Sequence, residues 1–513
     1  MMMPKSSSWK MLNRGIQRAV SQRSLKGTLA GTRSRHRIGR FKLPAEMTVP
    51  TCEALSPASK SAELSPPDVY LTTIGTGSQM PTEKRSVSAT ALNIGGRIWL
   101  FDCGEGTQLQ LWKSTISPPR ITRIFISHLH GDHFFGLPAV LCSMNTDRKE
   151  YDKPPVEIVG PPGLRRLVRS MLSAGATHLR YLYKVHELHP SSSSVNAEIA
   201  QQKLEGNVRH PQEILGKNIL PGPDGVWNHI PFSNKDVDTF AVHAVGLRHS
   251  QKISSTGFIL KETDYPGNFE DPDKVLNLIQ SDESRKRLPK RYQKHPHEIF
   301  NELKRGVAIE GVLSPTDVLG PTKPGRKIVI LGDTFDASTA ASMSAGATVV
   351  VHEATNGALS NLEKSNENET KKVIARTIMH GHSTPEMAGA FAQAVGAASL
   401  VLTHISPQYC GLEMKYPNVI TDGFAELARR EYDGHVVVAN DGMNIVIQGE
   451  WQSTDIPSAT ENERLVLPFV CEKDAESLVR NGTVTPKQAA LDAIRATDKF
   501  VQIAQDAARE AKT

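Results

Sequence analysis

The chain has 513 residues, of which 39% are hydrophobic and 22% charged, so it has ample material for a folded core. Its mean hydropathy is −0.33, and no segment reaches the ~18 consecutive apolar residues of a membrane-spanning helix, which excludes a protein built from such helices. The five cysteines are scattered and never form C-x-x-C, which excludes a disulfide framework and a thiolate zinc knuckle.

The first 45 residues have a one-sided charge pattern. They hold eleven Lys or Arg and no acidic residue, so the net charge of +6 leaves −5 for the rest of the chain. This basic, Ser-rich start, with an amphipathic stretch from Met11 to Leu25, predicts an organelle transit peptide, mitochondrial rather than plastid. The alternative is a disordered basic arm that binds nucleic acid or directs nuclear import. Because Ser, Pro and Thr persist to Pro67, we predict that residues 1–67 lie outside the fold.

The predicted fold begins at Val69. A β-rich stretch is followed by two strands that flank a Gly95-Gly96 turn, which predicts a hairpin. A buried strand then ends at a group of histidines, and a further strand leads through Pro161-Pro162-Gly163 into a helix. In chain order, the predicted strands are 69–74, 90–94, 97–101, 121–127 and 157–159, and the helix is 164–172.

In the second half of the chain, short apolar strands end in polar residues. Helices are predicted between these strands, one from Pro385 and one over 422–430. Alternating strands and helices predict an α/β layered domain over residues 68–450, and polar strand ends of such a sheet usually line its active site. The predicted strands are 327–331, 347–351, 400–403 and 436–439, and they end in Gly332-Asp333-Thr334, His352-Glu353, His404 and Asn440-Asp441.

Two segments interrupt this order and one follows it. Residues 190–225 are rich in Ser, Pro and Gly, and we predict a surface insertion. Residues 264–306 are the most basic stretch outside the leader, which fits either a solvated helix face or an arm that grips phosphates. Residues 451–513 include an Ala-rich amphipathic helix over 485–512, which we expect to dock on the body or on another subunit. The basic residues of the second segment are Arg285, Lys286, Arg287, Lys290, Arg291 and Lys294.

Three histidines and an aspartate lie within six positions after a predicted buried strand. They are His128, His130, Asp132 and His133. A single histidine is more often a solvated or core residue, but isolated core histidines have no reason to cluster. Imidazole and carboxylate donors of this kind suit Zn²⁺, and a loop at a strand end can aim alternate residues at two neighbouring ions.

Two ions need more ligands, and other predicted strand ends supply them. His249, Asp333 and His404 each follow a strand. Each residue alone has an ordinary explanation as a turn or core residue, but next to the histidine cluster we expect all three to be ligands. A carboxylate can bridge ions about 3.5–4 Å apart where an imidazole cannot, so Asp333 is the expected bridge.

In these residues and in several longer motifs, the chain resembles the short form of ribonuclease Z (tRNase Z). This family of the metallo-β-lactamase superfamily consists of endonucleases that process the 3′ end of tRNA. The resemblance covers roughly Val69 to Gln448 and implies an αβ/βα sandwich with a flexible arm. The 128–133 motif is shared by the whole superfamily and indicates only a binuclear metal-dependent hydrolase. The narrower motifs are FDCGEGTQ from Phe101, PTKPGRKIVILGDT from Pro321, HEAT from His352, GHST from Gly381 and LTHIS from Leu402.

The resemblance also implies a metal site and a catalytic pair. Two Zn²⁺ ions are expected, with Mn²⁺ as the alternative metal. A histidine beside a glutamate that fixes its tautomer can protonate the leaving 3′-oxygen, so His382 is the expected general acid and Glu353 its orienting residue. Asp132 is expected to hold the attacking water as well. The implied ligands are His128, His130 and His249 for one ion and Asp132, His133 and His404 for the other, with Asp333 bridging.

The chain departs from the family pattern at three places. The family loop Pro-x-x-x-Arg-Asn ends here in Arg85-Ser86, and the retained Arg85 is expected to help bind the RNA 3′ end. The arm tip reads KRYQKHPH from Lys290 and lacks the Gly/Pro-rich sequence of the family, although Lys and Arg contacts to phosphate do not depend on sequence. The long spacing from His249 to Gly257 leaves His243 as a rival third ligand.

The expected function is removal of the 3′ trailer from precursor tRNA. Because only one metallo-β-lactamase unit fits between Val69 and Gln448, we expect the homodimeric short form, acting away from membranes. One alternative is another hydrolase of the same fold, a small-molecule phosphodiesterase or thioesterase, which would have no use for a basic arm. The other is a non-catalytic RNA-binding platform, which would be expected to lack metal ligands.

Overall fold

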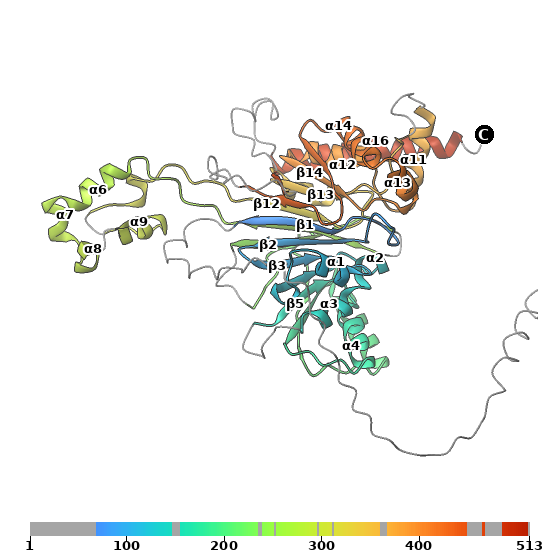
Figure 1. Cartoon of the computed structure of the whole chain (residues 1–513), viewed down its shortest axis with the longest axis horizontal. Helices are drawn as coiled ribbons and strands as arrows, with labels where there is room; N and C mark the ends of the chain where they lie inside the picture. The colour runs from blue at the N-terminus through green and yellow to red at the C-terminus, as the bar shows by residue number, and fades with distance from the viewer. Residues whose placement is uncertain are drawn as a thin grey trace, which may run out of the picture. The chain divides into compact units, whose positions relative to one another are not determined.

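The structure is a computed structural model in which two β-sheets pack face to face, with helices on both outer surfaces (Figure 1). This αβ/βα sandwich confirms the predicted fold class. The predicted leader, residues 1–67, lies outside the described residues. The described ranges are 68–145, 154–233, 239–250, 253–294, 297–309, 312–359, 367–448, 464–466 and 485–510.

The first sheet contains the predicted hairpin and the strand that precedes the histidine cluster. Within the described ranges its order is β17-β16-β1-β2-β3-β4-β5-β6-β7, and β8 also pairs with β6. Strands β1 to β3 are antiparallel, whereas β3 to β6 are parallel. Its strands are β1 Val69–Gly75, β2 Ala89–Ile94, β3 Arg97–Phe101, β4 Ile121–Phe125, β5 Val156–Gly160, β6 Tyr183–Leu188, β7 Glu213–Ile214, β8 Asn218–Ile219, β16 Asn444–Val446 and β17 Arg464–Val466.

The second sheet has the order β15-β14-β13-β12-β11-β10-β9 in the described part of the chain. Strands β9 to β12 are antiparallel and β12 to β15 are parallel. The carboxyl ends of the parallel strands therefore meet at one edge, where the predicted polar strand ends lie. Its strands are β9 Val226–Trp227, β10 Phe240–Leu247, β11 Ser255–Glu262, β12 Lys327–Leu331, β13 Val349–Glu353, β14 Ser399–Thr403 and β15 His435–Val438.

The alternation of side chains along each strand divides the core into layers. In β12, Ile328 and Ile330 pack between the two sheets, whereas Val329 and Leu331 pack against the helices on the other face. Both faces of β12 are therefore apolar, as expected for a strand covered on both sides. Because β12 is held from both sides, the polar residues that follow it are rigidly placed.

Helices cover the outer face of each sheet. Helices α1, α3 and α4 contribute buried residues to the layer outside the first sheet, and α10, α12, α14 and α16 do so outside the second. No helix in the described ranges is long and apolar enough to cross a bilayer. The helices of the sandwich are α1 Thr107–Lys113, α2 Gly131–Phe134, α3 Leu137–Ser143, α4 Leu164–Ala174, α5 Ser192–Leu204, α10 Ala341–Ser344, α11 Glu367–Met379, α12 Pro385–Ala394, α13 Cys410–Lys415, α14 Val419–Arg429 and α16 Pro486–Glu510.

The predicted insertion at residues 190–225 contains both a helix and strands. Helix α5 has no buried residue, in agreement with a surface position. Strands β7 and β8 both pair with β6, so this segment also widens the first sheet. The predicted C-terminal helix is present as α16, and the short strand β17 before it pairs with β16.

The basic segment forms a small helical unit, which we call the arm. It contains α6 Pro272–Gln280, α7 Asp282–Arg287, α8 Lys290–Lys294 and α9 His297–Lys304, which Figure 1 shows grouped apart from the helices of the sandwich. The arm has its own core, in which Val275 and Ile299 pack with Leu313. Its base closes where Tyr265 pairs with Lys323, so the unit extends past the predicted limits of 264–306.

Candidate metal centre

The predicted ligands converge at one edge of the sandwich although they come from distant parts of the sequence. His128 and His130 lie between β4 and α2, Asp132 and His133 lie in α2, and His249 follows β10. Asp333 follows β12 and His404 follows β14. The ends of strands from both sheets therefore meet here, as the sequence pattern predicts.

The first group of donors consists of three histidines and Asp333. One donor atom from each of His128, His130, His249 and Asp333 lies within 4.8 Å of the others. His130 Nδ1 is 3.0 Å from His128 Nε2 and 3.3 Å from His249 Nε2. Asp333 Oδ2 lies 3.7 Å from His128 Nε2.

The second group consists of Asp132, His133 and His404. The Nε2 atoms of the two histidines are 3.2 Å apart, and Asp132 Oδ2 lies 3.4 Å from that of His404 and 3.7 Å from that of His133. The carboxylate of Asp333 faces this group too. Its Oδ1 lies 3.3 Å from Nε2 of His133, and its Oδ2 lies 3.3 Å from Nε2 of His404. Asp333 therefore stands between the two groups, as a bridging ligand must.

The spacing of these donors fits zinc. Ligands at 2.0–2.1 Å from a tetrahedral ion are about 3.3 Å from each other, and the distances within each group lie around that value. Neighbouring imidazole nitrogens must share a proton or ligate a common cation, and three convergent donors in each group favour the cation. The residues therefore suit two ions, one in each group, with Asp333 shared.

The outward nitrogen of each buried ring also has a partner, which fixes the direction of the other nitrogen. His249 Nδ1 donates to the carbonyl of Gly381 at 2.8 Å, and His133 Nδ1 donates to Asp102 at 2.7 Å. Hydroxyls serve the other two rings, with Ser127 Oγ 3.0 Å from His128 Nδ1 and Thr355 Oγ1 2.8 Å from His404 Nδ1. Each of these hydroxyls in turn donates to a carboxylate, Ser127 to Asp102 and Thr355 to Glu353.

Sequence reasoning missed these supporting residues. Asp102 lies in the FDCGEGTQ motif and Thr355 in the HEAT motif, but neither motif reveals which imidazole its residue supports. No motif in the sequence marked Gln79 as a supporting residue. Its backbone has a φ of 62°, in the left-handed region, and this places its N–H 2.6 Å from Asp132 Oδ2.

Burial and charge set the protonation of the metal-free centre. Burial alone raises the pKa of Asp333, but the neighbouring His133 and His404 hold it well below its ordinary value. Burial lowers the pKa of His128. Burial alone would also lower the pKa of His404, but Asp333 raises it to about 10. Metal ions must therefore displace protons from part of the centre, so binding releases protons.

Glu353 and His382 lie beside the centre and face each other. His382 Nδ1 is 3.1 Å from Glu353 Oε2 and 3.7 Å from Asp333 Oδ2. The side chain of Glu353 is 2% exposed and that of His382 19%, so the imidazole lies between the buried carboxylate and solvent. Burial alone raises the pKa of Glu353, but the charge of His382 lowers it to about 2. Burial alone lowers the pKa of His382, but Glu353 raises it.

Three other histidines lie away from these donors. The rival ligand His243 is in β10, where Nδ1 is 3.1 Å from Asn228 Oδ1, and it belongs to neither donor group. His380 is exposed and bonds to the carbonyl of Arg376. His352 bonds to the backbone carbonyl of Glu353, which leaves the Glu353 carboxylate to His382.

The structure does not support the prediction that Arg85 contacts RNA. Its side chain is 3% exposed and forms an ion pair with Glu413 at 2.6 Å. The guanidinium also donates to Thr76 Oγ1, to the carbonyl of Ala439 and to Asn440 Oδ1. All its nitrogens are thus engaged inside the protein, because the loop it belongs to folds back onto the turn after β15.

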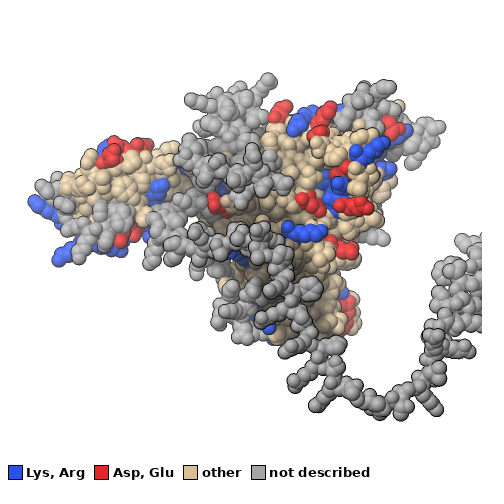
Figure 2. All heavy atoms as spheres, viewed as in Figure 1, with Lys and Arg blue, Asp and Glu red and all other residues tan. Residues whose placement is uncertain are grey.

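The predicted basic residues of the arm differ in their surroundings. Lys286, Arg287 and Lys290 are exposed, and Figure 2 shows cationic side chains at the far end of the arm. Arg291 lies 3.0 Å from Glu298 and 2.9 Å from Glu302, so acids on α9 neutralise much of its charge. The side chains of Arg285 and Lys294 lie outside those that the structure describes.

Comparisons with known proteins give consistent relatives. The chain is 37% identical over 369 residues to human zinc phosphodiesterase ELAC protein 1, and the aligned residues cover 70% of this chain and 92% of the relative. It is 33% identical over 351 residues to ribonuclease Z of Acaryochloris marina, which covers 66% and 87%. The crystal structure of human tRNase Z, short form, matches with 30% identity and a TM-score of 0.46, covering 74% of this chain and 99% of that one. A family model for the anti-Pycsar protein Apyc1 matches residues 69–210.

Proposed function

We infer that the chain, which belongs to the ribonuclease Z family of the metallo-β-lactamase superfamily, removes the 3′ trailer from precursor tRNA. The observation that carries this inference is the position of Asp333 between two groups of zinc-type donors, with the Glu353–His382 pair beside it. A centre of this kind suits the hydrolysis of a phosphodiester, because that reaction needs an activated water, a stabilised phosphate and a proton for the leaving oxygen.

The proposed ligand assignment follows the two donor groups. The first ion would be held by His128, His130 and His249, and the second by Asp132, His133 and His404, with Asp333 shared. When bound, zinc ions lower the pKa of water and neutralise charge on phosphate oxygens. The buried partners of His128, His133, His249 and His404 keep these donor nitrogens in place before any ion or substrate arrives.

The protein side chains would move the protons. Asp132 accepts a hydrogen bond from the Gln79 N–H and is placed to orient the attacking water and take its proton. As water adds to phosphorus, the bond from phosphorus to the 3′-oxygen breaks, and His382 donates a proton to that oxygen. Because Glu353 occupies Nδ1, Nε2 is the nitrogen that delivers it. The products are a tRNA with a 3′-hydroxyl and a trailer with a 5′-phosphate.

The direct test uses the purified full chain and a precursor tRNA with a labelled 3′ trailer. A single cut at the start of the trailer, which leaves a 3′-hydroxyl on the tRNA, supports the proposal. A small chromogenic phosphodiester and a thioester serve as parallel substrates. Turnover of either one without any cut in the precursor tRNA would favour a different hydrolase of this fold.

We also propose that the exposed cations of the arm, Lys286, Arg287 and Lys290, contact tRNA phosphates away from the cut. Contacts between such side chains and phosphate are strong, independent of sequence and weakened by salt. The arm has its own core, so it can present these charges as a rigid unit. This gives the basic segment a role that a small-molecule hydrolase would not need.

A homodimer is the assembly we propose. Each chain has a single metallo-β-lactamase unit. In a dimer, the arm of one subunit can hold an RNA that is cut in the other subunit. Light scattering on the active protein should give twice the chain mass. A strict monomer with full activity would contradict the proposal.

We propose that the acid-free basic leader directs the chain to mitochondria. A fusion of residues 1–65 to a fluorescent reporter should enter mitochondria. Import into plastids would correct the choice of organelle, whereas a diffuse or nuclear signal would reject the transit peptide.

A further inference from the structure

Helix α16 covers helices that flank the metal centre. Its buried residues include Ala489, Ala493 and Phe500. Phe500 packs with Met387 of α12 and Ile374 of α11 in a small apolar cluster. Phe335, two residues after the bridging Asp333, packs against the same cluster. The helix is therefore in contact with the segment that follows β12.

A hydrogen bond joins α16 to that segment. Thr497 Oγ1 lies 3.2 Å from Asp336 Oδ1, and Asp336 Oδ2 accepts from Arg248 at 3.1 Å. Asp336 is 5% exposed and stands three residues after Asp333, and Arg248 directly precedes His249. Asp336 thus links α16 to the loops that carry two predicted ligands from different strands.

The same two loops are also tied to each other. Thr334 Oγ1 and Phe335 N both donate to the carbonyl of Arg248, at 2.9 Å and 3.0 Å. Ser383 Oγ donates to the carbonyl of Thr334 at 2.5 Å, and Ser383 follows His382. A displacement of residues 334–336 would therefore be felt at His249, Asp333 and His382 together.

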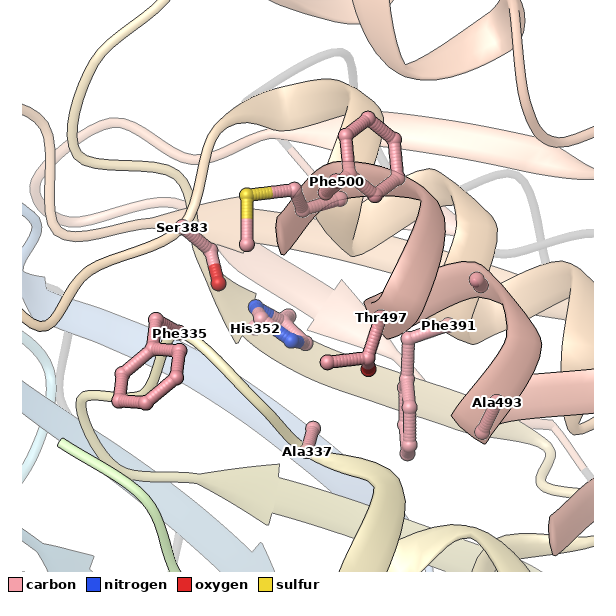
Figure 3. Close-up of a pocket in the computed structure, with 10 residues that line it drawn as sticks. Phe335, Ala337, His352, Ser383, Phe391, Ala493, Thr497 and Phe500 are labelled. Carbon is pink, nitrogen blue, oxygen red and sulfur yellow. The ribbon is translucent and has the colours of Figure 1, made fainter. Parts of the chain in front are cut away.

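Figure 3 shows how closely the helix is seated. Thr497 points toward His352, and Thr497 and Phe500 line a cavity of about 20 Å³ together with Phe335, His352 and Ser383. A cavity of this size has room for about one water molecule, so α16 has little freedom to shift without losing contacts. The wall opposite α16 is formed in part by the residues that neighbour the metal ligands and the proposed general acid.

We propose that α16 positions the metal centre, with Thr497 and Phe500 as positioning residues that hold the 334–336 segment in place. Neither residue would contact the metal or the RNA. They would act through Asp336 and Phe335, which fix the direction of Asp333 and the start of the His249 loop. This inference rests on the proposed function, because it assigns the helix to the support of that same site.

The primary test is Thr497→Val in the full chain. The change keeps the shape of the side chain but removes the hydrogen bond to Asp336. Groups that orient metal ligands typically change affinity by about 10–100-fold, and Thr497 is one step further out, so we expect about three- to tenfold weaker zinc binding. The measurement is zinc competition with a chromophoric chelator, together with kcat and KM on precursor tRNA.

Matched variants separate positioning from general stability. Thr497→Ser retains the hydroxyl and should restore zinc affinity and kcat. Arg495→Met, two positions before Thr497 on the same helix, removes an exposed ion pair with Asp492 and should leave both unchanged. Phe500→Leu tests the apolar contact with a change small enough for the protein to fold. KM should stay constant in all four variants because the RNA-binding surface is untouched.

Two outcomes would overturn the proposal. If Thr497→Val lowers the melting temperature but binds zinc as tightly as the wild type, the helix stabilises the fold and does not position the centre. Equal loss of zinc affinity in Thr497→Val and Thr497→Ser would show that the hydroxyl is irrelevant. A wild-type chain that binds zinc but never cuts precursor tRNA would refute the proposed function, and the zinc titrations would still decide the role of α16.

Discussion

The carboxylate of Glu353 lies 3.1 Å from Nδ1 of His382 and is itself almost fully buried. The backbone N–H of Thr334 donates to Oε1 of the same carboxylate at 2.6 Å, so Glu353 cannot turn away. This contact holds the imidazole in one orientation and one tautomer, with Nε2 left for the substrate. The carboxylate also raises the pKa of His382, which keeps the imidazole protonated to higher pH.

Glu353→Gln should move the alkaline limb of the kcat profile to lower pH. A general acid works while it is protonated, so activity is lost as pH rises through its pKa. Glu353 raises the pKa of His382, and removing the negative charge lowers that pKa again. The limb should therefore shift toward acid, as measured by single-turnover rates at saturating precursor tRNA. A limb that stays in place would mean that another group controls it.

Asp333→Ala should remove the shared ligand of the two donor groups. Zinc analysis of the purified variant should give fewer than two ions per chain, because both groups lose an oxygen at once. A loss of several kcal/mol of transition-state stabilisation corresponds to a fall in kcat of about 10³-fold or more. The control is Asp433→Ala, which removes an exposed carboxylate that is distant from Asp333 in the sequence. Two tightly bound ions in Asp333→Ala would contradict the bridging role.

Arg85→Met should destabilise the protein while leaving the KM for precursor tRNA unchanged. The substitution leaves the buried Glu413 carboxylate without its partner, which typically lowers the free energy of unfolding by about 3–5 kcal/mol. Chemical denaturation measures this loss, and kinetics at a temperature where the variant stays folded measure KM. A raised KM with wild-type stability would restore the prediction from sequence that Arg85 contacts RNA.

The layers and the convergence of the proposed metal ligands were predictable because their signals are local. Strand β12 is a run of apolar residues followed at once by Gly332-Asp333, and the cluster from His128 to His133 is contiguous in sequence. Residues of this kind reach the same edge of the sandwich once the strands pair in the usual way.

The supporting contacts were not predictable in this way, because they join positions far apart in sequence. Thr355 meets His404 across 49 residues, and Arg85 meets Glu413 across 328. The arm was predicted from its charge, but its helices and core depend on apolar residues such as Leu288 and Leu313, which lie between and beyond the basic ones. The sequence likewise did not predict which helices α16 packs against, whereas the contacts of Phe500 identify them as α11 and α12.

Replacing Lys286, Arg287 and Lys290 together by Ala should weaken the binding of precursor tRNA. Each lost phosphate contact reduces the slope of log K against log salt by about 0.7–0.9, so the triple variant should reduce it by roughly 2–3. KM for precursor tRNA should rise, while hydrolysis of a small phosphodiester stays unchanged because the metal centre is intact. Lys372→Ala, an exposed lysine on α11, is the matched control. Equal loss on both substrates would show that these residues support the fold.

His382→Ala should lower kcat on precursor tRNA by about 10²–10⁴-fold, the usual effect of losing a general acid. Both zinc ions should remain bound, because His382 belongs to neither ligand set proposed for the two ions, and metal analysis of the variant checks this. The decisive comparison uses a phosphodiester whose leaving group is a stable phenolate and needs no proton. On that substrate the variant should recover most of its rate. If it remains as impaired as on precursor tRNA, the imidazole acts on the metals or on the fold, and its assignment as the proton donor to the 3′-oxygen is wrong.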